Sequence, residues 1–511
     1  MTALRRVQAV LDDWFLQHCH GQSGIGLAWL PACCNDFLRG RVNGDPPFRI
    51  LMKRLFEQLQ EAKARRFNLC ATSSPSPLFE GFLDRFDPVL GVCAVDGRSP
   101  ATRLKDGIPM CELSADQIEV GRHLVTQSRV LISRESLDHN TLSLPIFGYY
   151  VQFTGEEEKS GRFGPIARTG NLRRVWDFTL PRQGDAPLFN GYARRFINGY
   201  VPRFGQQNAW EQGRYERLPA ELRDGWEPDA PKTLEHLACD DRQPDEQHRY
   251  RGIEALMTLK GDVDNLGLLF ESGLEPPTFA KMAALSRQMN AFFAVWLPWH
   301  CSLKRPSVYT VFAGGDDFFL IGPWHSTMQL AREMRTEFSR YVAGNPQIHF
   351  SAGLSMTKPG LPVRQMGQLT EEALDHSKGR RDREGLLVKN AVTCFGQTVS
   401  WQEWEALWTI GDEIDRVAKE LNLPTGYLYG LQFLADMAGR LQQGSGPIED
   451  ALWNSRFVYR TRRLLERQRG MDARARMVWQ ERLGTLLGGG ISRHGSAFKL
   501  ALFTYLYQHR Y

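Results

Sequence analysis

The stretch that decides the fold reads Ala-Leu-Met-Thr-Leu-Lys-Gly-Asp-Val-Asp-Asn-Leu-Gly over residues 255–267. Its apolar start predicts a buried strand, which ends at the Gly-Asp pair. A second stretch, Phe-Ala-Gly-Gly-Asp-Asp, occupies 312–317, and apolar runs at 307–311 and 318–321 flank it. Two apolar runs around a Gly-Gly-Asp-Asp tip predict a β-hairpin.

The residues around these stretches predict one compact domain over 250–401. Helical periodicity alternates with strand-like runs, which gives the order β-α-β-β-α-β followed by a further helix. That order is typical of the ferredoxin-like palm, so the predicted fold class is α/β of the α+β type. The predicted helices cover 279–296, 326–342 and 363–378, the predicted fourth strand covers 348–356, and 391–401 is a candidate edge strand.

Three aspartates would converge in such a palm. Asp262 ends the first strand, and Asp316 and Asp317 lie at the hairpin tip of the strand expected beside it. Neighbouring strands lie about 4.8 Å apart, so the carboxylates can meet although they are distant in sequence. Two divalent cations held by carboxylates can clamp the attacking and leaving oxygens of phosphoryl transfer. We therefore predict a nucleotidyl-transfer site with two Mg²⁺ or Mn²⁺ ions, held by these catalytic aspartates.

Other residues of the two stretches are candidates for binding the nucleotide. Gly314 and Gly315 permit a tight turn and let a ligand approach the backbone. The main-chain carbonyl of Val263 is a further candidate ligand. Asp264 and Asn265 either belong to the site or cap the helix that follows, and the sequence leaves both possibilities open.

Two features downstream fit the same site. Ser351 belongs to the small-residue run Ser-Ala-Gly at 351–353, which leaves room for a base or ribose or else permits close packing against a helix. Lys378 ends a predicted helix, where it either reaches a triphosphate or complements the helix dipole.

These motifs resemble the large, polymerase- and cyclase-like subunit of type III CRISPR effector complexes, most closely the III-A (Csm) type. The similarity is carried by Lys-Gly-Asp-Val-Asp-Asn-Leu-Gly (260–267), Phe-Ala-Gly-Gly-Asp-Asp (312–317), Phe-Ser-Ala-Gly-Leu (350–354) and Phe-Gly-Gln-Thr-Val-Ser-Trp (395–401). Weaker similarity covers nearly the whole chain, from a degenerate zinc ribbon to the helical tail.

The resemblance implies a function. Members of this family make cyclic oligoadenylates from ATP at the Gly-Gly-Asp-Asp palm when guide RNA pairs with a foreign transcript. Asp262, Asp316 and Asp317 would then hold Mg²⁺, while Ser351 would lie near a nucleotide and Lys378 near phosphates. The implied partners are the other subunits of the effector complex, CRISPR RNA and target RNA.

The remaining chain is expected to form three further regions. Residues 1–90 are a partial first palm-like α/β domain with a strand at 25–32 and a helix at 48–67, so the chain is expected to begin inside that palm. Residues 91–230 hold the degenerate ribbon and β-rich runs, and 402–511 form a helical domain. Members of the family often begin with a His-Asp nuclease domain. None of the twelve histidines here is followed by Asp, so no DNase activity is expected.

Zinc is not expected in the ribbon. A zinc ribbon needs two paired Cys-x-x-Cys knuckles to supply four ligands. In this chain Cys93 is followed at the matching offset by Asp96, and Cys111 by Ser114. His123 is the alternative fourth ligand.

Composition excludes several classes of protein. The 511 residues are 42% hydrophobic and 24% charged, which excludes wholesale disorder, and the net charge of +5 permits an RNA partner. Nine scattered cysteines argue against a disulfide scaffold and favour the cytoplasm. No uncharged apolar run approaches about 18 residues, so no membrane partner is expected.

Two other functions compete with the one implied by the resemblance. The first is a diguanylate-cyclase-like nucleotidyl cyclase, which shares the palm and a Gly-Gly-acidic hairpin. The second is a non-catalytic RNA-binding scaffold of the effector complex. It is favoured by the tail segment 451–482, which has nine Arg against three acidic residues.

Overall fold

The computed structural model divides the chain into two compact units, Met1–Asn198 with Asn265–Ser286 and Gly199–Asp264 with Arg287–Tyr511. The residues it describes are 2–19, 24–37, 44–65, 86–136, 142–144, 148–155, 168–181, 192–197, 199–205, 213–224, 227–382, 384–468 and 470–510. None of the helices within these ranges is long and apolar enough to cross a membrane.

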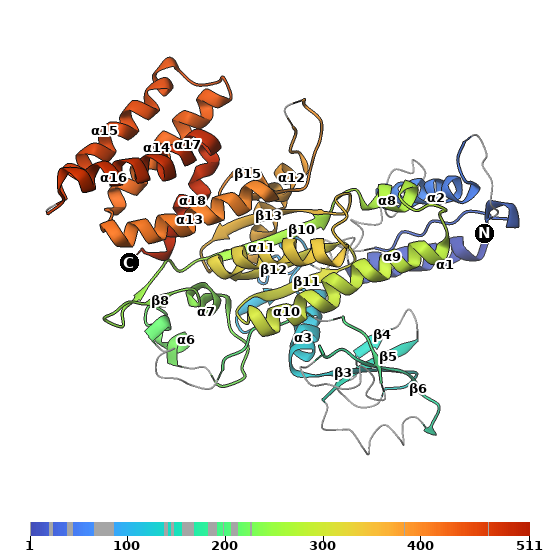
Figure 1. Cartoon of the computed structure of the whole chain (residues 1–511). Helices are drawn as coiled ribbons and strands as arrows, with labels where there is room; N and C mark the ends of the chain where they lie inside the picture. Colours follow the sequence, from blue (N-terminus) through green and yellow to red (C-terminus); the bar gives the residue numbers. More distant parts are fainter. Residues whose placement is uncertain are drawn as a thin grey trace. The chain divides into compact units, whose positions relative to one another are not determined.

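The second unit is built on a six-stranded sheet with the order β11-β12-β10-β13-β14-β15 (Figure 1). β10 is central, and its antiparallel neighbours β12 and β13 flank it on either side. The first four positions reproduce the strand order of the ferredoxin-like palm, which confirms the predicted fold class. The strands are β10 (Leu256–Val263), β11 (Tyr309–Gly314), β12 (Asp317–Pro323), β13 (Phe350–Thr357), β14 (Ala391–Cys394) and β15 (Gln397–Ser400).

The helices of the palm lie where the sequence predicts them. The helix after β10 is longer than predicted, because a single π-helical turn at Phe292–Trp296 joins α9 to α10 without a break. The boundary between the two units falls within α9. The helices are α9 (Phe279–Ala291), α10 (Leu297–Lys304), α11 (Trp324–Tyr341) and α12 (Val363–Lys378).

Different side chains cover the two faces of the palm sheet. On one face Phe318 stacks on Phe293 of the π-turn, with ring centroids 5.3 Å apart, and Phe338 of α11 packs against Phe350 at 5.4 Å. On the other face Leu256 and Ile321 form a core with Met366 of α12 and with α7 (Leu234–Cys239). Strand side chains alternate between faces, so the residues of β10 are divided between these two cores.

A helical region follows the sheet within the same unit (Figure 1). Trp401 begins α13, and its indole Nε1 donates a hydrogen bond to the Phe350 carbonyl at 2.9 Å, which ties the first helical turn to β13. Ser400 caps α13 by accepting a hydrogen bond from the Glu403 N–H. The helices are α13 (Trp401–Leu421), α14 (Thr425–Gln442), α15 (Trp453–Glu466), α16 (Ala473–Leu483), α17 (Gly489–His494) and α18 (Lys499–Gln508).

Short elements precede the palm within the second unit. They are α6 (Ala220–Asp224), α7 and the paired strands β8 (Gln243–Pro244) and β9 (Tyr250–Arg251). Asp241, which follows α7, accepts hydrogen bonds from the backbone N–H groups of His325 and Ser326 at the start of α11.

The first unit combines helices with two small sheets. The hairpin β1-β2 precedes α3, and a five-stranded sheet has the order β4-β5-β3-β6-β7. The elements are α1 (Thr2–Cys19), α2 (Pro47–Ala64), β1 (Arg103–Lys105), β2 (Ile108–Met110), α3 (Glu112–Thr126), β3 (Arg129–Ser133), β4 (Leu142–Leu144), β5 (Tyr149–Thr154), β6 (Leu172–Asp177), β7 (Ala193–Arg194) and α8 (Leu266–Ser272).

The predicted strand at 25–32 is wrong. These residues have no regular secondary structure, and two of their backbone groups bond to a side chain instead of a neighbouring strand. Gln8 of α1 donates to the Ile25 carbonyl and accepts from the Leu27 N–H, both at 2.8 Å. The predicted helix at 48–67 corresponds to α2, whose described part ends near Arg65.

Candidate active site

Two of the predicted aspartates face each other across paired strands. In the sheet register Asp262 of β10 lies opposite Asp317 of β12 on one side and opposite Ser351 of β13 on the other. Directly opposed residues of antiparallel strands point to the same face, with Cβ atoms about 5 Å apart. The fold therefore brings together two carboxylates that are 55 positions apart in sequence.

The hairpin tip is tighter than predicted. β11 ends at Gly314 and β12 begins at Asp317, so the turn has two residues instead of four. Gly315 has φ +66°, a left-handed conformation that side chains disfavour, and its N–H donates to Asn290 Oδ1 at 3.0 Å. The Asp316 carbonyl accepts from the Val263 N–H at 3.0 Å. This bond holds the tip against the end of β10.

Two lysines, Lys378 and Lys260, lie close enough for their charges to act on the aspartates. Lys378, the last residue of α12, forms an ion pair with Asp262. Lys260, two residues before Asp262 on the same face of β10, pairs with Glu371 of α12. The carboxylates therefore lie on the face of the sheet that α12 covers, and Lys378 lies at the site as predicted. Its contact is a carboxylate, which neither of the two interpretations of this residue anticipated.

Ionisation of Asp262 and Asp317 is unfavourable in the folded chain, and a bound cation would offset this cost. Burial raises the pKa of Asp262 and that of Asp317, and the charges of neighbouring aspartates, including Asp316, raise both further. Asp317 Oδ1 is buried and has no hydrogen-bond partner in the described structure. A hard divalent cation prefers such carboxylate oxygens. Asp262 and Asp317 therefore fit a divalent cation, and the charge of Asp316 acts on both of them.

The raised pKa values predict how stability responds to metal and pH. A carboxyl group whose pKa is higher in the folded chain than in the unfolded chain lowers the free energy of unfolding when it is ionised. This cost shrinks as the pH falls through the folded-state pKa, and it is gone below the pKa of the unfolded chain. Asp317→Asn should therefore raise the Tm slightly at pH 7 in EDTA. Mg²⁺ should stabilise the wild type more than the variant, which calorimetric scans can measure. A lower Tm of Asp317→Asn in EDTA would contradict this account of the site.

Asp264 does not line the site, because its carboxylate is buried behind it and bonds to β13. Its side chain is 1% exposed and accepts hydrogen bonds from Ser351 Oγ (2.9 Å), His349 Nδ1 (2.7 Å) and the Asn390 backbone N–H (3.1 Å). Both alternatives predicted for Asp264, a nucleotide ligand and a helix cap, are therefore replaced by an internal anchor. Ser351 is fully buried and its hydroxyl faces Asp264, so direct contact of that hydroxyl with a nucleotide is not favoured.

Two further candidates take different places. Asn265 precedes α8 at φ +56° without a side-chain capping bond, and it belongs to the first compact unit. Of the two interpretations offered for the small-residue run, close packing is the one observed at Gly353. A Cβ at this position would collide with the backbone of α12 at Thr370 and Leu374. The glycine therefore lets α12 approach β13, which brings Lys378 to Asp262.

Sequence reasoning missed the residues that support the site from outside the motifs. Asn290 lies in the middle of a helix, and His349 and Asn390 lie at the edges of predicted strands. No local pattern distinguishes these polar residues from solvent-exposed ones, because their partners come from distant elements. The available signal was the second aspartate of Gly-Asp-Val-Asp, Asp264, which directly follows a buried strand and would therefore need partners from elsewhere in the fold.

The degenerate ribbon brings its remaining candidate ligands together in the first unit. The ligand atoms of Cys93, Asp96 and Cys111 all lie within 4.8 Å of one another. Ser114 takes the fourth position, and its hydroxyl lies 3.2 Å from the Cys111 thiol and 3.5 Å from that of Cys93. His123 instead stacks on Phe153, with ring centroids 5.2 Å apart. Two thiols and one carboxylate make an incomplete structural zinc site.

We predict that purified protein contains far less than one zinc ion per chain. Burial raises the pKa of the Cys111 thiol, whereas hydrogen bonds, the Ser114 side chain's first, lower that of Cys93, so only one of the two thiols is disposed to supply the thiolate that zinc requires. Elemental analysis of the full chain checks this directly, with Cys301→Ser as a control for a buried cysteine outside the cluster. About one zinc per chain that Cys93→Ser removes would refute the prediction.

Comparison with known proteins shows which families share this architecture. The family model of the Cas10/Cmr2 second palm domain matches residues 255–387. The chain is similar to the CRISPR system single-strand-specific deoxyribonuclease Cas10/Csm1 (subtype III-A) of Thermococcus onnurineus, with 24% identity over 79% of this chain and 48% of the relative. The corresponding protein of Methanocaldococcus jannaschii is 30% identical over 29% of this chain and 21% of its own length. The chain thus spans at most about half of these relatives.

Solved structures share the fold across nearly the whole chain. The Csm1-Csm4 cassette in complex with one ATP matches with a TM-score of 0.61 and 19% identity, over 98% of this chain and 59% of that one. The cassette in complex with cA3 matches with a TM-score of 0.58 and 18% identity, over the same shares.

Proposed function

We propose that this chain, a homologue of Cas10/Csm1, the large subunit of subtype III-A CRISPR systems, is a cyclic oligoadenylate synthase. The second palm of this chain converts ATP into cyclic oligoadenylates. The chain does so as a subunit of an effector complex that responds to target RNA. Structures of the related Csm1-Csm4 cassette in complex with ATP, cA3 and cA4 support this proposal.

The observation that carries the proposal is the opposed pair Asp262 and Asp317 with the unpartnered Oδ1 of Asp317. Divalent cations held there with Asp316 would stabilise the charge that develops on the attacking and leaving oxygens. The chain itself supplies a rigid frame. The Val263 N–H holds the hairpin tip, and Asn290 fixes Gly315 in its left-handed turn. When Asp262 binds a cation, the Lys378 ammonium is free to neutralise phosphate oxygens.

Incubation with single nucleotides tests the proposal against the diguanylate-cyclase-like alternative. The chain, assembled with its partner subunits and target RNA, is supplied with ATP or GTP and with Mg²⁺ or Mn²⁺. We expect ATP to be consumed and GTP to remain. Conversion of GTP alone into a cyclic dinucleotide would favour the alternative. The proposal does not extend to DNA cleavage, since no His-Asp pair occurs in this sequence, and a labelled single strand should stay intact.

A role in binding RNA and partner subunits is compatible with catalysis, and the arginine-rich helix α15 is the candidate surface. Its arginines differ in what they contact. Arg460 donates to the Gly430 carbonyl at 3.1 Å, and Arg462 pairs with Glu466 at 3.0 Å. Arg463 lies over the Tyr459 ring and is exposed, as is Arg467. Arg463 and Arg467 are therefore the arginines best placed to contact phosphates.

Changing Arg463 and Arg467 to Glu should weaken assembly with guide RNA in a salt-dependent way. Each phosphate contact releases counterions, so the slope of log affinity against log salt should become shallower by about one per lost contact. Binding measured across salt concentrations checks this, with Arg98→Glu as an exposed control outside the helical region. An unchanged slope would favour a solvated helix whose ion pairs contribute a few tenths of a kcal/mol each.

A further inference from the structure

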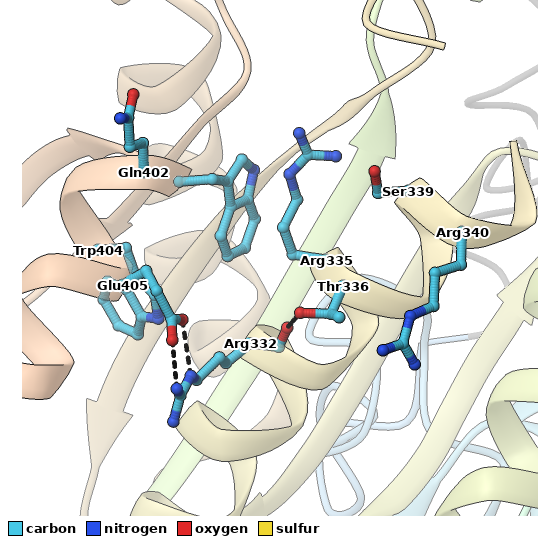
Figure 2. A pocket seen from close by; sticks show the side chains of 9 residues that line it. Arg332, Arg335, Thr336, Ser339, Arg340, Gln402, Trp404 and Glu405 are labelled. Atoms are coloured by element: carbon cyan, nitrogen blue, oxygen red, sulfur yellow. Dashed lines mark hydrogen bonds and ion pairs between the residues drawn. The ribbon is translucent and has the colours of Figure 1, made fainter. Parts of the chain in front are cut away.

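A pocket that none of the site aspartates lines lies between α11 and the first turns of α13 (Figure 2). Its volume is about 430 Å³, within the range of small-molecule sites. α11 contributes Arg332, Arg335, Thr336, Ser339 and Arg340, and α13 contributes Trp401, Gln402, Trp404 and Glu405. The pocket shares no lining residue with the palm site.

The three arginines of this pocket are not equivalent. Arg332 forms a two-point ion pair with Glu405, with Nε 2.6 Å from Oε2. Arg340 is largely exposed, pairs with Glu337 and points away from the pocket in Figure 2. Arg335 is half-buried and makes no hydrogen bond or ion pair within the described structure. Burial lowers the pKa of its guanidinium, and the more distant charge of Asp264 opposes this shift. Arg335 is the lining cation whose charge is left without a direct partner.

Hydrogen-bonding groups line the same pocket as this cation. Figure 2 shows Ser339 beside Arg335 and Gln402 further away, while the Thr336 hydroxyl donates to the Arg332 carbonyl at 3.2 Å. The start of the 21-residue helix α13 adds the positive end of its dipole. Trp404 is 3% exposed, and its indole Nε1 is a buried donor without a hydrogen-bond partner in the described structure. All these features favour an anion.

We propose that this pocket binds the phosphate group of a nucleotide, with Arg335 as the principal contact. A phosphate monoester offers three terminal oxygens to the guanidinium, the hydroxyls and the amide, whereas a carboxylate offers two. The pocket is larger than a phosphate, which leaves space for a nucleoside beside the Trp401 and Trp404 walls. The ligand is either a free mononucleotide or the 5′-phosphorylated end of an RNA strand. This inference is independent of the catalytic proposal.

Calorimetric titration of the full chain tests the proposal. EDTA and the Asp316→Ala, Asp317→Ala background remove metal-dependent binding at the palm. The probes are AMP, adenosine, inorganic phosphate and a short RNA with or without a 5′-phosphate. We expect AMP to bind and adenosine not to bind. Arg335→Gln should weaken AMP binding at least about tenfold, because a charge-assisted contact is lost. Arg416→Gln, an exposed change further along α13, should have no effect.

The RNA arms identify the source of the phosphate. Binding of RNA only when it is 5′-phosphorylated, and more tightly than AMP, assigns the pocket to a strand end, and the opposite order assigns it to a free nucleotide. Should Arg335→Gln fail to fold, Ser339→Ala with Gln402→Ala must weaken AMP binding and Arg335→Lys must retain part of it. Equal binding of AMP and adenosine, no binding of any phosphate probe, or AMP affinity unchanged by these substitutions would overturn the proposal.

Discussion

Replacing Asp316 and Asp317 together by alanine should reduce oligoadenylate formation at least about a hundredfold. Metal ions contribute several kcal/mol to the stabilisation of the transition state, and each 1.36 kcal/mol lost makes the reaction about tenfold slower. The fold should persist, because both side chains lie at the hairpin tip and the pKa of Asp317 is raised by its burial. Removing carboxylates that repel one another does not unfold the sheet.

The control for this double variant is a pair of carboxylates on the neighbouring helix. Glu372 and Asp375 are exposed residues of α12 and take no part in the site. Glu372→Ala with Asp375→Ala removes the same charge and should retain product formation. Circular dichroism and gel filtration establish that both variants are folded. Undiminished product from the Asp316 and Asp317 variant would remove these residues from the catalytic account.

Of the substitutions considered, Asp264→Ala should lower the free energy of unfolding most, by about 3–5 kcal/mol. The reason is that the buried hydrogen-bond partners of this carboxylate are left unsatisfied. The carboxylate accepts from Ser351, His349 and the Asn390 backbone, so its loss loosens β13 and the segment before β14 together. Asp264→Asn keeps an acceptor oxygen and should lose less. Asp375→Ala, an exposed change, is the control.

Urea unfolding followed by tryptophan fluorescence measures this effect. Trp401 is one of the thirteen tryptophans that contribute to this signal, and its indole bonds to the carbonyl of Phe350, the residue before Ser351. The chain has two compact units, so the transition that includes this probe is compared between variants instead of a single global one. A midpoint for Asp264→Ala equal to that of the wild type would show that the buried network contributes little.

The sequence was sufficient to predict the palm because its signals are local. Apolar runs around a Gly-Gly-Asp-Asp tip specify a hairpin, and Val363–Lys378 has a helical period that the structure reproduces as α12. The convergence of Asp262 with Asp317 could also be predicted from the sequence, because the order of the strands decides which residues lie opposite each other. The roles of these residues in catalysis remain predictions.

The parts that could not be predicted depend on contacts between distant elements. Asp264 was open to two interpretations because its partners, His349 and Asn390, come from other segments. The segment 25–32 has a strand-like sequence, but Gln8 satisfies its backbone groups. Arg335 looks like any helix-surface arginine until α13 packs beside it and half buries it.

Mass spectrometry of the products formed from ATP tests the central claim most directly. The chain, assembled with its partner subunits and guide RNA, is incubated with ATP and Mg²⁺ in the presence or absence of target RNA. The account predicts cyclic oligoadenylates that require target RNA, require the divalent cation and disappear with the Asp316 and Asp317 substitutions. Unconverted ATP under all these conditions, with the complex shown to be assembled and bound to target RNA, would contradict it.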